Sequence, residues 1–164
     1  MAKLKVAIIM GSDSDLPVMK EAVKVLDDNK VPHEVRIMSA HRSPLDVAKF
    51  SKNARKNGYG IIIAGAGGAA HLAGVIASHT TLPVIGVPME TNELKGVDSL
   101  FSTVQMPSGV PVATVTIGKA GARNAAILAI QIMSLSDKRL ERGLCAFKRS
   151  LAAGVRQKNK SLKL

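Results

Sequence analysis

The fold of this 164-residue chain is indicated most clearly by the stretch Gly60-Ile61-Ile62-Ile63-Ala64, continued directly by Gly65-Ala66-Gly67-Gly68-Ala69-Ala70. Its first part is apolar without alternation, which is typical of a central strand in a parallel sheet covered on both faces. The small residues that follow predict a turn from this strand into a helix. A parallel sheet needs crossover connections, so the stretch predicts an α/β protein.

Strand and helix patterns alternate on both sides of this stretch. A long connection at 88–111 is predicted to be irregular. Because crossovers between parallel strands are right-handed, the pattern predicts a three-layer α/β sandwich with a parallel sheet. The expected strands span residues 3–10, 32–38, 60–64, 83–87 and 112–116, and the expected helices span 16–29, 44–57, a short segment ending near 78, 119–135 and 138–155.

The last two helices predict a homo-oligomer. The helix at 119–135 is apolar around most of its circumference, so it should be buried on more than one side. The helix at 138–155 is an extra C-terminal element with one apolar stripe of Leu140, Leu144, Phe147 and Leu151, and such an appended helix commonly packs on a neighbouring subunit. We expect a single catalytic domain at 1–155 and a flexible basic tail at 156–164.

Composition excludes several classes of protein. Cys145 is the only cysteine, so a disulfide within the chain and a cysteine metal site are both excluded. The N-terminus lacks the apolar segment of a signal peptide, and no apolar run is long enough to span a membrane. These features predict a cytoplasmic protein without a membrane partner.

The formal net charge of +11 is a property of the C-terminal end. Between Asp137 and Leu164, nine basic side chains face two acidic ones, a net charge of +7, which leaves +4 for the rest of the chain. Such basic runs are usually solvated. With one Tyr, three Phe and no Trp, the chain also lacks a stacking surface for single strands, so nucleic acid is not the expected partner.

The segment Met38-Ser39-Ala40-His41-Arg42-Ser43-Pro44 is the strongest candidate for a catalytic loop. It places His41 and Arg42 where a predicted strand gives way to a helix, at the sheet edge where open α/β proteins bind ligands. An imidazole there can exchange a proton near neutral pH, and the guanidinium can hold an anion. The alternative interpretation is a solvated loop histidine.

Two further turns follow predicted strands. The turn Gly11-Ser12-Asp13-Ser14-Asp15 fits phosphate or sugar binding at a helix N-terminus and equally fits plain helix capping. The string at 65–70 matches the loose dinucleotide fingerprint, with Glu90 about 20 residues beyond. That match is weak because the string follows the third strand rather than the first. Its glycines are better explained by a small ligand lying against bare backbone.

No other motif competes with proton transfer as the predicted chemistry. His71 could bind substrate or be structural. Neither the histidines nor the carboxylates have the spacing of metal ligands, so we expect no metal. No nucleophile motif such as G-x-S-x-G is present.

Several strings, taken in order between Val6 and Ile132, are more specific together than any one of them. They are Met10-Gly11-Ser12 with Ser14-Asp15, Ser39-Ala40-His41-Arg42, Ala64-Gly65-Ala66-Gly67-Gly68-Ala69-Ala70-His71-Leu72, Gly96-Val97-Asp98-Ser99-Leu100, Gln105-Met106-Pro107 with Gly109, and Ile117-Gly118-Lys119-Ala120-Gly121. These strings closely resemble the N5-carboxyaminoimidazole ribonucleotide mutase family of purine biosynthesis, also called the catalytic subunit of phosphoribosylaminoimidazole carboxylase. Ala73 stands where that family often has proline, and the chain beyond about Leu144 lies outside the resemblance.

The resemblance implies a flavodoxin-like fold, a homo-octamer, and an isomerase that uses neither a metal nor an organic cofactor. Its reaction in IMP biosynthesis moves a carboxylate from the exocyclic N5 of the nucleotide to ring carbon C4. The route is decarboxylation to bound aminoimidazole ribonucleotide and CO2, then capture of CO2 by C4. Some members carboxylate the nucleotide with free CO2 instead, and the sequence leaves the carboxyl donor open.

The resemblance also implies roles for individual residues. His41 would be the general acid and base. The substrate-binding residues would be Ser12, Asp15 and Arg42 at the ribose and phosphate, Ser39 near the phosphate, and Gly67 and His71 around the imidazole and the migrating carboxylate. Two alternatives from other classes remain, a dinucleotide-dependent oxidoreductase and a non-enzymatic nucleotide-binding or nucleic-acid-binding module.

Overall fold

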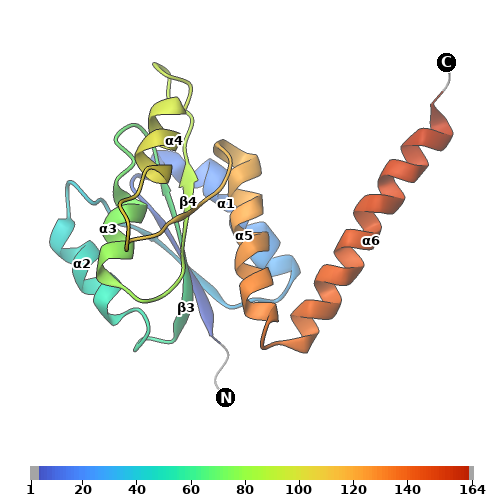
Figure 1. Ribbon diagram of the computed structural model, residues 1–164, viewed down its shortest axis with the longest axis horizontal. Coiled ribbons are helices and arrows are strands. Elements are labelled where there is room, and N and C mark those ends of the chain that lie inside the picture. Colours follow the sequence, from blue (N-terminus) through green and yellow to red (C-terminus); the bar gives the residue numbers. More distant parts are fainter. Residues whose placement is uncertain (1–3, 163–164) are drawn as a thin grey trace. The chain divides into compact units, whose positions relative to one another are not determined.

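The computed structural model describes residues 4–162 and contains a five-stranded sheet in the order β2-β1-β3-β4-β5 (Figure 1). Every neighbouring pair of strands is parallel. This order matches the flavodoxin-like arrangement, so the predicted fold class is confirmed. The strands are β1 (Lys5–Met10), β2 (His33–Ile37), β3 (Tyr59–Ala66), β4 (Val84–Pro88) and β5 (Ala113–Thr114).

The apolar stretch that decided the fold lies at the centre of this sheet. Ile63 of β3 pairs with Ile8 of β1 on one side and with Ile85 of β4 on the other. All three side chains are fully buried, as expected for strands covered on both faces. The edge strand β2 differs, because its Val35 and Ile37 remain exposed.

Helices cover both faces of the sheet, which makes the predicted three layers. Figure 1 shows α2 and α3 on one side, with α1 and the first part of α5 on the other. On the α2–α3 side, Phe50 and Ile76 pack in one apolar cluster with Ile62 of β3. The helices are α1 (Leu16–Asp28), α2 (Pro44–Asn53), α3 (Leu72–His79), α4 (Val97–Val104), α5 (Gly118–Ser134) and α6 (Lys138–Ser161), and a short 3-10 helix, η1 (Asp13–Asp15), precedes α1.

The prediction of an irregular connection at 88–111 is wrong, because α4 lies within it. In α4 the apolar residues that recur at helical spacing, Val97, Phe101 and Val104, are exposed. The buried positions are the polar Ser99 and Thr103. Thr103 donates its hydroxyl hydrogen to the Ser99 carbonyl. Its methyl group packs against Gly86 of β4, where a side chain would collide with it.

Helix boundaries also differ from the sequence prediction near α2 and α6. Helix α2 ends at Asn53 rather than near Asn57, and turns lead from there to Gly58, which has a φ of +80°. Helix α6 continues to Ser161, six residues past its expected end. The flexible tail predicted at 156–164 stays a prediction, and residues 163–164 lie outside the described residues.

The contacts within the chain form two units, Met1–Ala129 and Ile130–Leu164, where the sequence predicted one domain at 1–155. The first contains the whole sheet. The second contains the end of α5 and the long helix α6, in which Leu140 is the buried residue. Within residues 4–162, no helix has both the length and the apolar character needed to cross a membrane.

Candidate active site

A cavity of about 460 Å³ lies at the carboxyl ends of β1, β3 and β4. In this strand order the connections leave β1 and β3 in opposite directions, and ligands bind where such a divergence opens the sheet edge. The cavity is lined by Gly11, Ser12, Ser14, Asp15, Ser39, Ala40, His41, Arg42, Ala66, Gly67, Ala69, Leu72, Met89, Glu90 and Thr91.

Two imidazoles meet at this cavity. The Nε2 atom of His41 lies 2.9 Å from the Nδ1 atom of His71, within hydrogen-bonding distance, and the rings are nearly perpendicular at 86°. One nitrogen donates the hydrogen and the other accepts it, depending on the tautomers. His71 directly precedes α3, which packs on the sheet, so the contact fixes the orientation of the His41 ring.

Arg42 is anchored on the adjoining β1 turn. Its Nη2 atom donates to the Gly11 carbonyl at 2.9 Å, and its backbone amide donates to the Ser39 hydroxyl at 3.1 Å. The loop is tied again because the Ser43 hydroxyl accepts from the Ser39 amide at 3.1 Å. These bonds hold a guanidinium at the cavity while leaving some of its five N–H groups for an anionic ligand.

The turn after β1 serves both as a helix cap and as a cavity wall. The Ser12 hydroxyl accepts from the Ser14 amide, as an N-cap residue does, and both side chains also line the cavity. Burial raises the pKa of the Asp15 carboxyl, although hydrogen bonds from the Ser12 and Gly11 backbone act in the opposite direction. The two sequence interpretations, capping and ligand binding, are therefore compatible.

The glycine-rich loop is shaped by a helix that the sequence prediction missed. The Gly68 amide donates to the Ser99 hydroxyl at 2.9 Å, and the Ala70 amide donates to the Ser102 hydroxyl at 3.0 Å. Gly68 has a φ of +65°, a conformation that favours glycine. A Cβ atom on Gly67 would approach the Cβ of Met89 to 3.2 Å, so small residues here keep the cavity open.

Sequence reasoning also missed the wall that follows β4. Met89, Glu90 and Thr91 line the cavity directly after the end of this strand. The available signal was topological, because the carboxyl ends of parallel strands share one edge of the sheet. Glu90, considered at first as part of a dinucleotide fingerprint, belongs to this wall.

The structure brings together the residues that the sequence singled out. Among residues 4–162, no three His, Cys, Asp or Glu side chains come together as a metal site would require. Ser12, Asp15, Ser39, His41, Arg42 and Gly67 all line the cavity, and His71 contacts it through His41.

Comparisons with known proteins agree with this architecture. A sequence profile described as AIR carboxylase matches residues 5–153. N5-carboxyaminoimidazole ribonucleotide mutase of Bacillus subtilis is 57% identical over 139 residues, covering 85% of this chain and 86% of that protein. The Haemophilus influenzae protein of the same name is 54% identical over 144 residues, 88% of each chain.

A solved structure agrees as well. The crystal structure of Treponema denticola PurE superposes with a TM-score of 0.88 at 28% identity, covering 97% of this chain and 98% of that one. The family indicated by the sequence motifs is thus confirmed, and the chain belongs to the AIR carboxylase family.

Proposed function

We propose that this protein is an N5-carboxyaminoimidazole ribonucleotide mutase of purine biosynthesis, with His41 as its general acid and base. The observation that carries the proposal is the imidazole of His41, held by His71 at the mouth of a small cavity beside Arg42. The mutase name of relatives that are more than half identical supports it.

The proposed reaction is an isomerisation in which every atom is retained. The N5–carboxylate bond breaks to give CO2 and aminoimidazole ribonucleotide, and N5 gains a proton. C4 then forms a bond to the same CO2, and the proton on C4 is removed. One imidazole can deliver the first proton and accept the second, since histidine exchanges protons near neutral pH.

The cavity suits a reaction that must retain CO2. Gly67 and Ala69 present little side chain, so a flat imidazole and CO2 can lie close to the backbone. Holding CO2 next to C4 replaces an encounter in solution by a step within one complex, which is a large entropic advantage. His71, through its contact with His41, keeps the acid–base group directed at this space.

We assign the ribose and phosphate to the polar side of the cavity. Arg42 offers unused N–H groups, and the Ser12 and Ser39 hydroxyls lie around it. The Asp15 carboxylate is suited to accept hydrogen bonds from ribose hydroxyls.

The carboxyl donor is tested by isotope labelling. We would supply N5-carboxyaminoimidazole ribonucleotide labelled with carbon-13 in its carboxyl, in excess unlabelled bicarbonate, and analyse the product by mass spectrometry. Label retained in the C4 carboxyl supports the mutase. Product without label would identify a carboxylase that uses free CO2, the activity that the family description favours as second candidate. No product from folded protein would contradict both.

We further infer a homo-oligomer, an octamer by the family resemblance, that acts in the cytoplasm. Self-association is supported in the α/β unit by an exposed apolar row on and just before α4, formed by Leu94, Val97, Phe101 and Val104. Helix α6 has a second exposed row, formed by Phe147, Leu151 and Val155. Contiguous exposed apolar surface of this kind marks protein contacts. Light scattering of the purified protein tests this inference, and a monomer would contradict it.

A further inference from the structure

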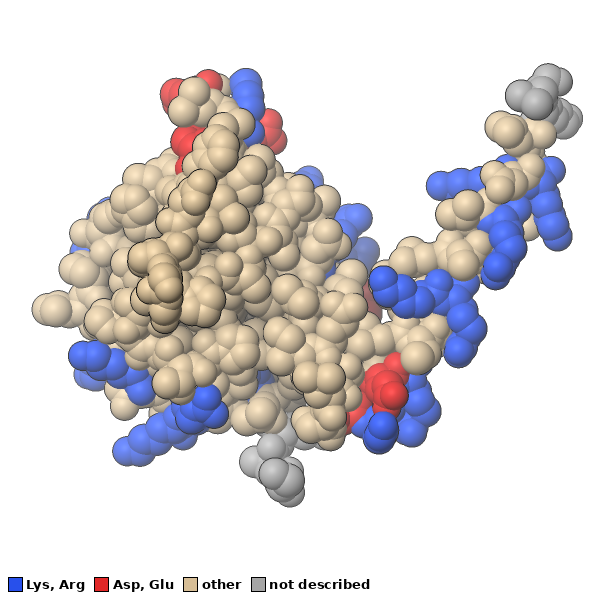
Figure 2. Space-filling view, in the orientation of Figure 1, with Lys and Arg blue, Asp and Glu red and all other residues tan. Residues whose placement is uncertain are grey.

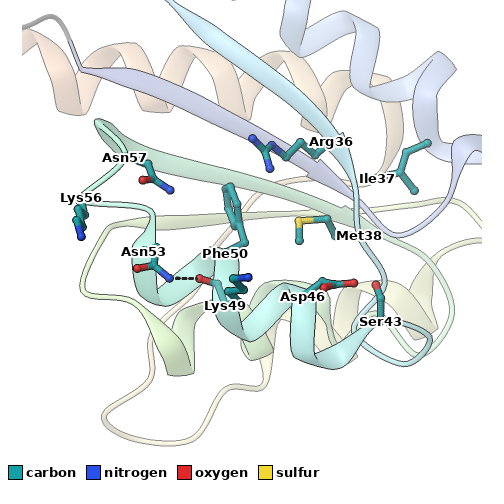
Figure 3. A pocket seen from close by; sticks show the side chains of 10 residues that line it. All are labelled: Arg36, Ile37, Met38, Ser43, Asp46, Lys49, Phe50, Asn53, Lys56 and Asn57. Carbon is teal, nitrogen blue, oxygen red and sulfur yellow. Dashed lines mark hydrogen bonds between the residues drawn. The ribbon is translucent and has the colours of Figure 1, made fainter.

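A second and larger hollow, of about 850 Å³, lies between the edge strand β2 and helix α2 (Figure 3). We call it the α2 groove. Phe50 forms its floor, and the Arg36 guanidinium lies 5.4 Å from the centre of that ring. Figure 3 labels the residues that line it.

The α2 groove carries an excess of positive charge. Lys49, Lys56 and Arg36 line it against the single carboxylate of Asp46. Arg36 is neutralised locally, because its Nη2 atom lies 2.5 Å from Oε1 of Glu34. Within the described part of the chain, neither lysine forms an ion pair, so both ammonium groups are available to a mobile anion.

A small hollow of about 310 Å³ adjoins both the α2 groove and the catalytic cavity. The groove and this hollow share Ile37, Met38 and Ser43. The hollow and the cavity share Gly11, Ser12, Ser39 and Arg42. Arg42 lines both the catalytic cavity and this hollow, so it lies at the junction between them.

The catalytic cavity itself is short of positive charge. Of its lining side chains, Arg42 is the permanent cation, and it is set against the carboxyls of Asp15 and Glu90. A nucleotide that carries a phosphate and a carboxylate would bind more favourably with additional positive potential nearby. Charges in an open groove act over roughly 10 Å at 0.1 M salt, so the lysines of an adjoining groove contribute to that potential.

We propose that the α2 groove is an anion-collecting approach, in which Lys49 and Lys56 draw phosphorylated nucleotides toward Arg42 and the catalytic cavity. The proposal rests on the proposed function for the identity of the nucleotide. The groove binds the phosphate transiently through long-range attraction, and Arg42 receives it at the junction. The lysines touch no reacting atom, so they raise the rate of productive encounter and leave the chemical step unchanged.

The test is a double charge reversal with a matched control. The variant Lys49→Glu with Lys56→Glu replaces the positive charges of both groove lysines by negative ones. The control, Lys20→Glu with Lys24→Glu, changes the net charge equally, and both of its lysines are exposed on α1, which covers the other face of the sheet from α2. We would measure kcat and KM for 4-carboxyaminoimidazole ribonucleotide across a salt series, and check the assembly size of each variant by light scattering.

We expect the groove variant to lose about three- to tenfold in kcat/KM at low salt with kcat unchanged, and the loss to vanish near about 0.5 M salt. The control should stay within about twofold of the wild type. An equal effect in both variants, a salt-independent loss, or a change in assembly size would overturn the proposal, the last by making the groove a subunit interface. A wild type that does not consume the nucleotide would instead refute the proposed function.

Discussion

The α/β unit, residues 4–129 of the described chain, and helix α6 use apolar residues in opposite ways. In the first, the central strands β1, β3 and β4 bury isoleucine side chains completely. In α6, Leu140 is buried, whereas Phe147, Leu151 and Val155 are 39%, 50% and 61% exposed. The first unit therefore has a core of its own, whereas helix α6 has an apolar stripe that remains exposed.

The two regions also differ in charge. Most of the net positive charge lies beyond Asp137, and Figure 2 shows Lys and Arg side chains along α6. The candidate site, by contrast, is a cavity with one arginine and two carboxyls. The candidate site and the most basic part of the chain thus lie in different regions, and the following substitutions test what each region contributes.

The largest expected difference in the free energy of unfolding is between Ile63→Ala and Leu151→Ala. Ile63 is fully buried in β3, so its truncation should cost about 3 to 4 kcal/mol of unfolding free energy through lost burial and a cavity. Leu151 is half exposed, and its truncation should cost less than about 0.5 kcal/mol within the subunit while weakening self-association. Urea unfolding measures the loss of stability, and light scattering measures self-association. An equal loss of unfolding free energy in the two variants would contradict the contrast between a buried core and an exposed stripe.

Two helical glycines should differ next most in how substitution by alanine changes the stability of the protein. A Cβ atom on Gly121 of α5 would overlap the backbone carbonyl oxygen of Thr116, so Gly121→Ala should destabilise the protein by at least about 2 kcal/mol. Gly154 of α6 has open space around it, and Gly154→Ala should stabilise the helix by up to about 1 kcal/mol. Thermal unfolding should therefore shift in opposite directions, and a shared direction would contradict the comparison.

His71→Phe tests whether the contact between His71 and His41 is used in the reaction. Removing the nitrogen that meets His41 should lower kcat by about 10- to 100-fold, because the imidazole loses its fixed orientation. The pH profile of kcat should also change shape, which a purely structural role would not cause. His71→Gln retains a hydrogen-bonding side chain and should recover part of the activity. An unchanged pH profile in His71→Phe would show that the contact is not used.

The smallest expected effect is on acid stability. The Tyr59 hydroxyl donates to Glu34, and with Arg36 and Lys5 it lowers the pKa of this carboxyl to about 2, against the opposing effect of burial. The folded state thus binds fewer protons than the unfolded state between about pH 2 and 4.5. Stability from Glu34 is complete above this window and is lost as the pH falls through it.

Because Glu34 is about a third exposed, solvent screening should limit its contribution to less than about 1 kcal/mol. Urea unfolding of the wild type and Glu34→Gln should therefore differ at pH 6, and the difference should shrink steadily as the pH falls from about 4.5 toward 2. A difference that is constant with pH would show that the cluster acts through packing rather than ionisation.

The sequence predicted those parts of the fold that have strong apolar periodicity. The uninterrupted run at 60–64 identified β3, and Pro44 marked the start of α2 at the correct residue. Helix α4 escaped prediction although its apolar residues recur at helical spacing, because they lie on its exposed face. Its buried face carries Ser99 and Thr103, whose polar groups are satisfied by hydrogen bonds that a sequence does not display.

The candidate site was predictable to a similar extent. Loops after β1, β2 and β3 could be assigned to one sheet edge from the strand order that α/β proteins share. The contact between His41 and His71, 30 positions apart, depends on how two loops fold over that edge. The wall at Met89 to Thr91 and the α2 groove likewise arise from tertiary packing, which no local pattern encodes.

The central claim is that His41 transfers the proton. We would follow the loss of 4-carboxyaminoimidazole ribonucleotide by ultraviolet absorbance, and measure nucleotide binding by calorimetry, for the wild type and His41→Asn. The account predicts that the variant binds the nucleotide with similar affinity and loses at least about a hundredfold in turnover. Turnover equal to the wild type, from a folded variant that still binds the nucleotide, would contradict it.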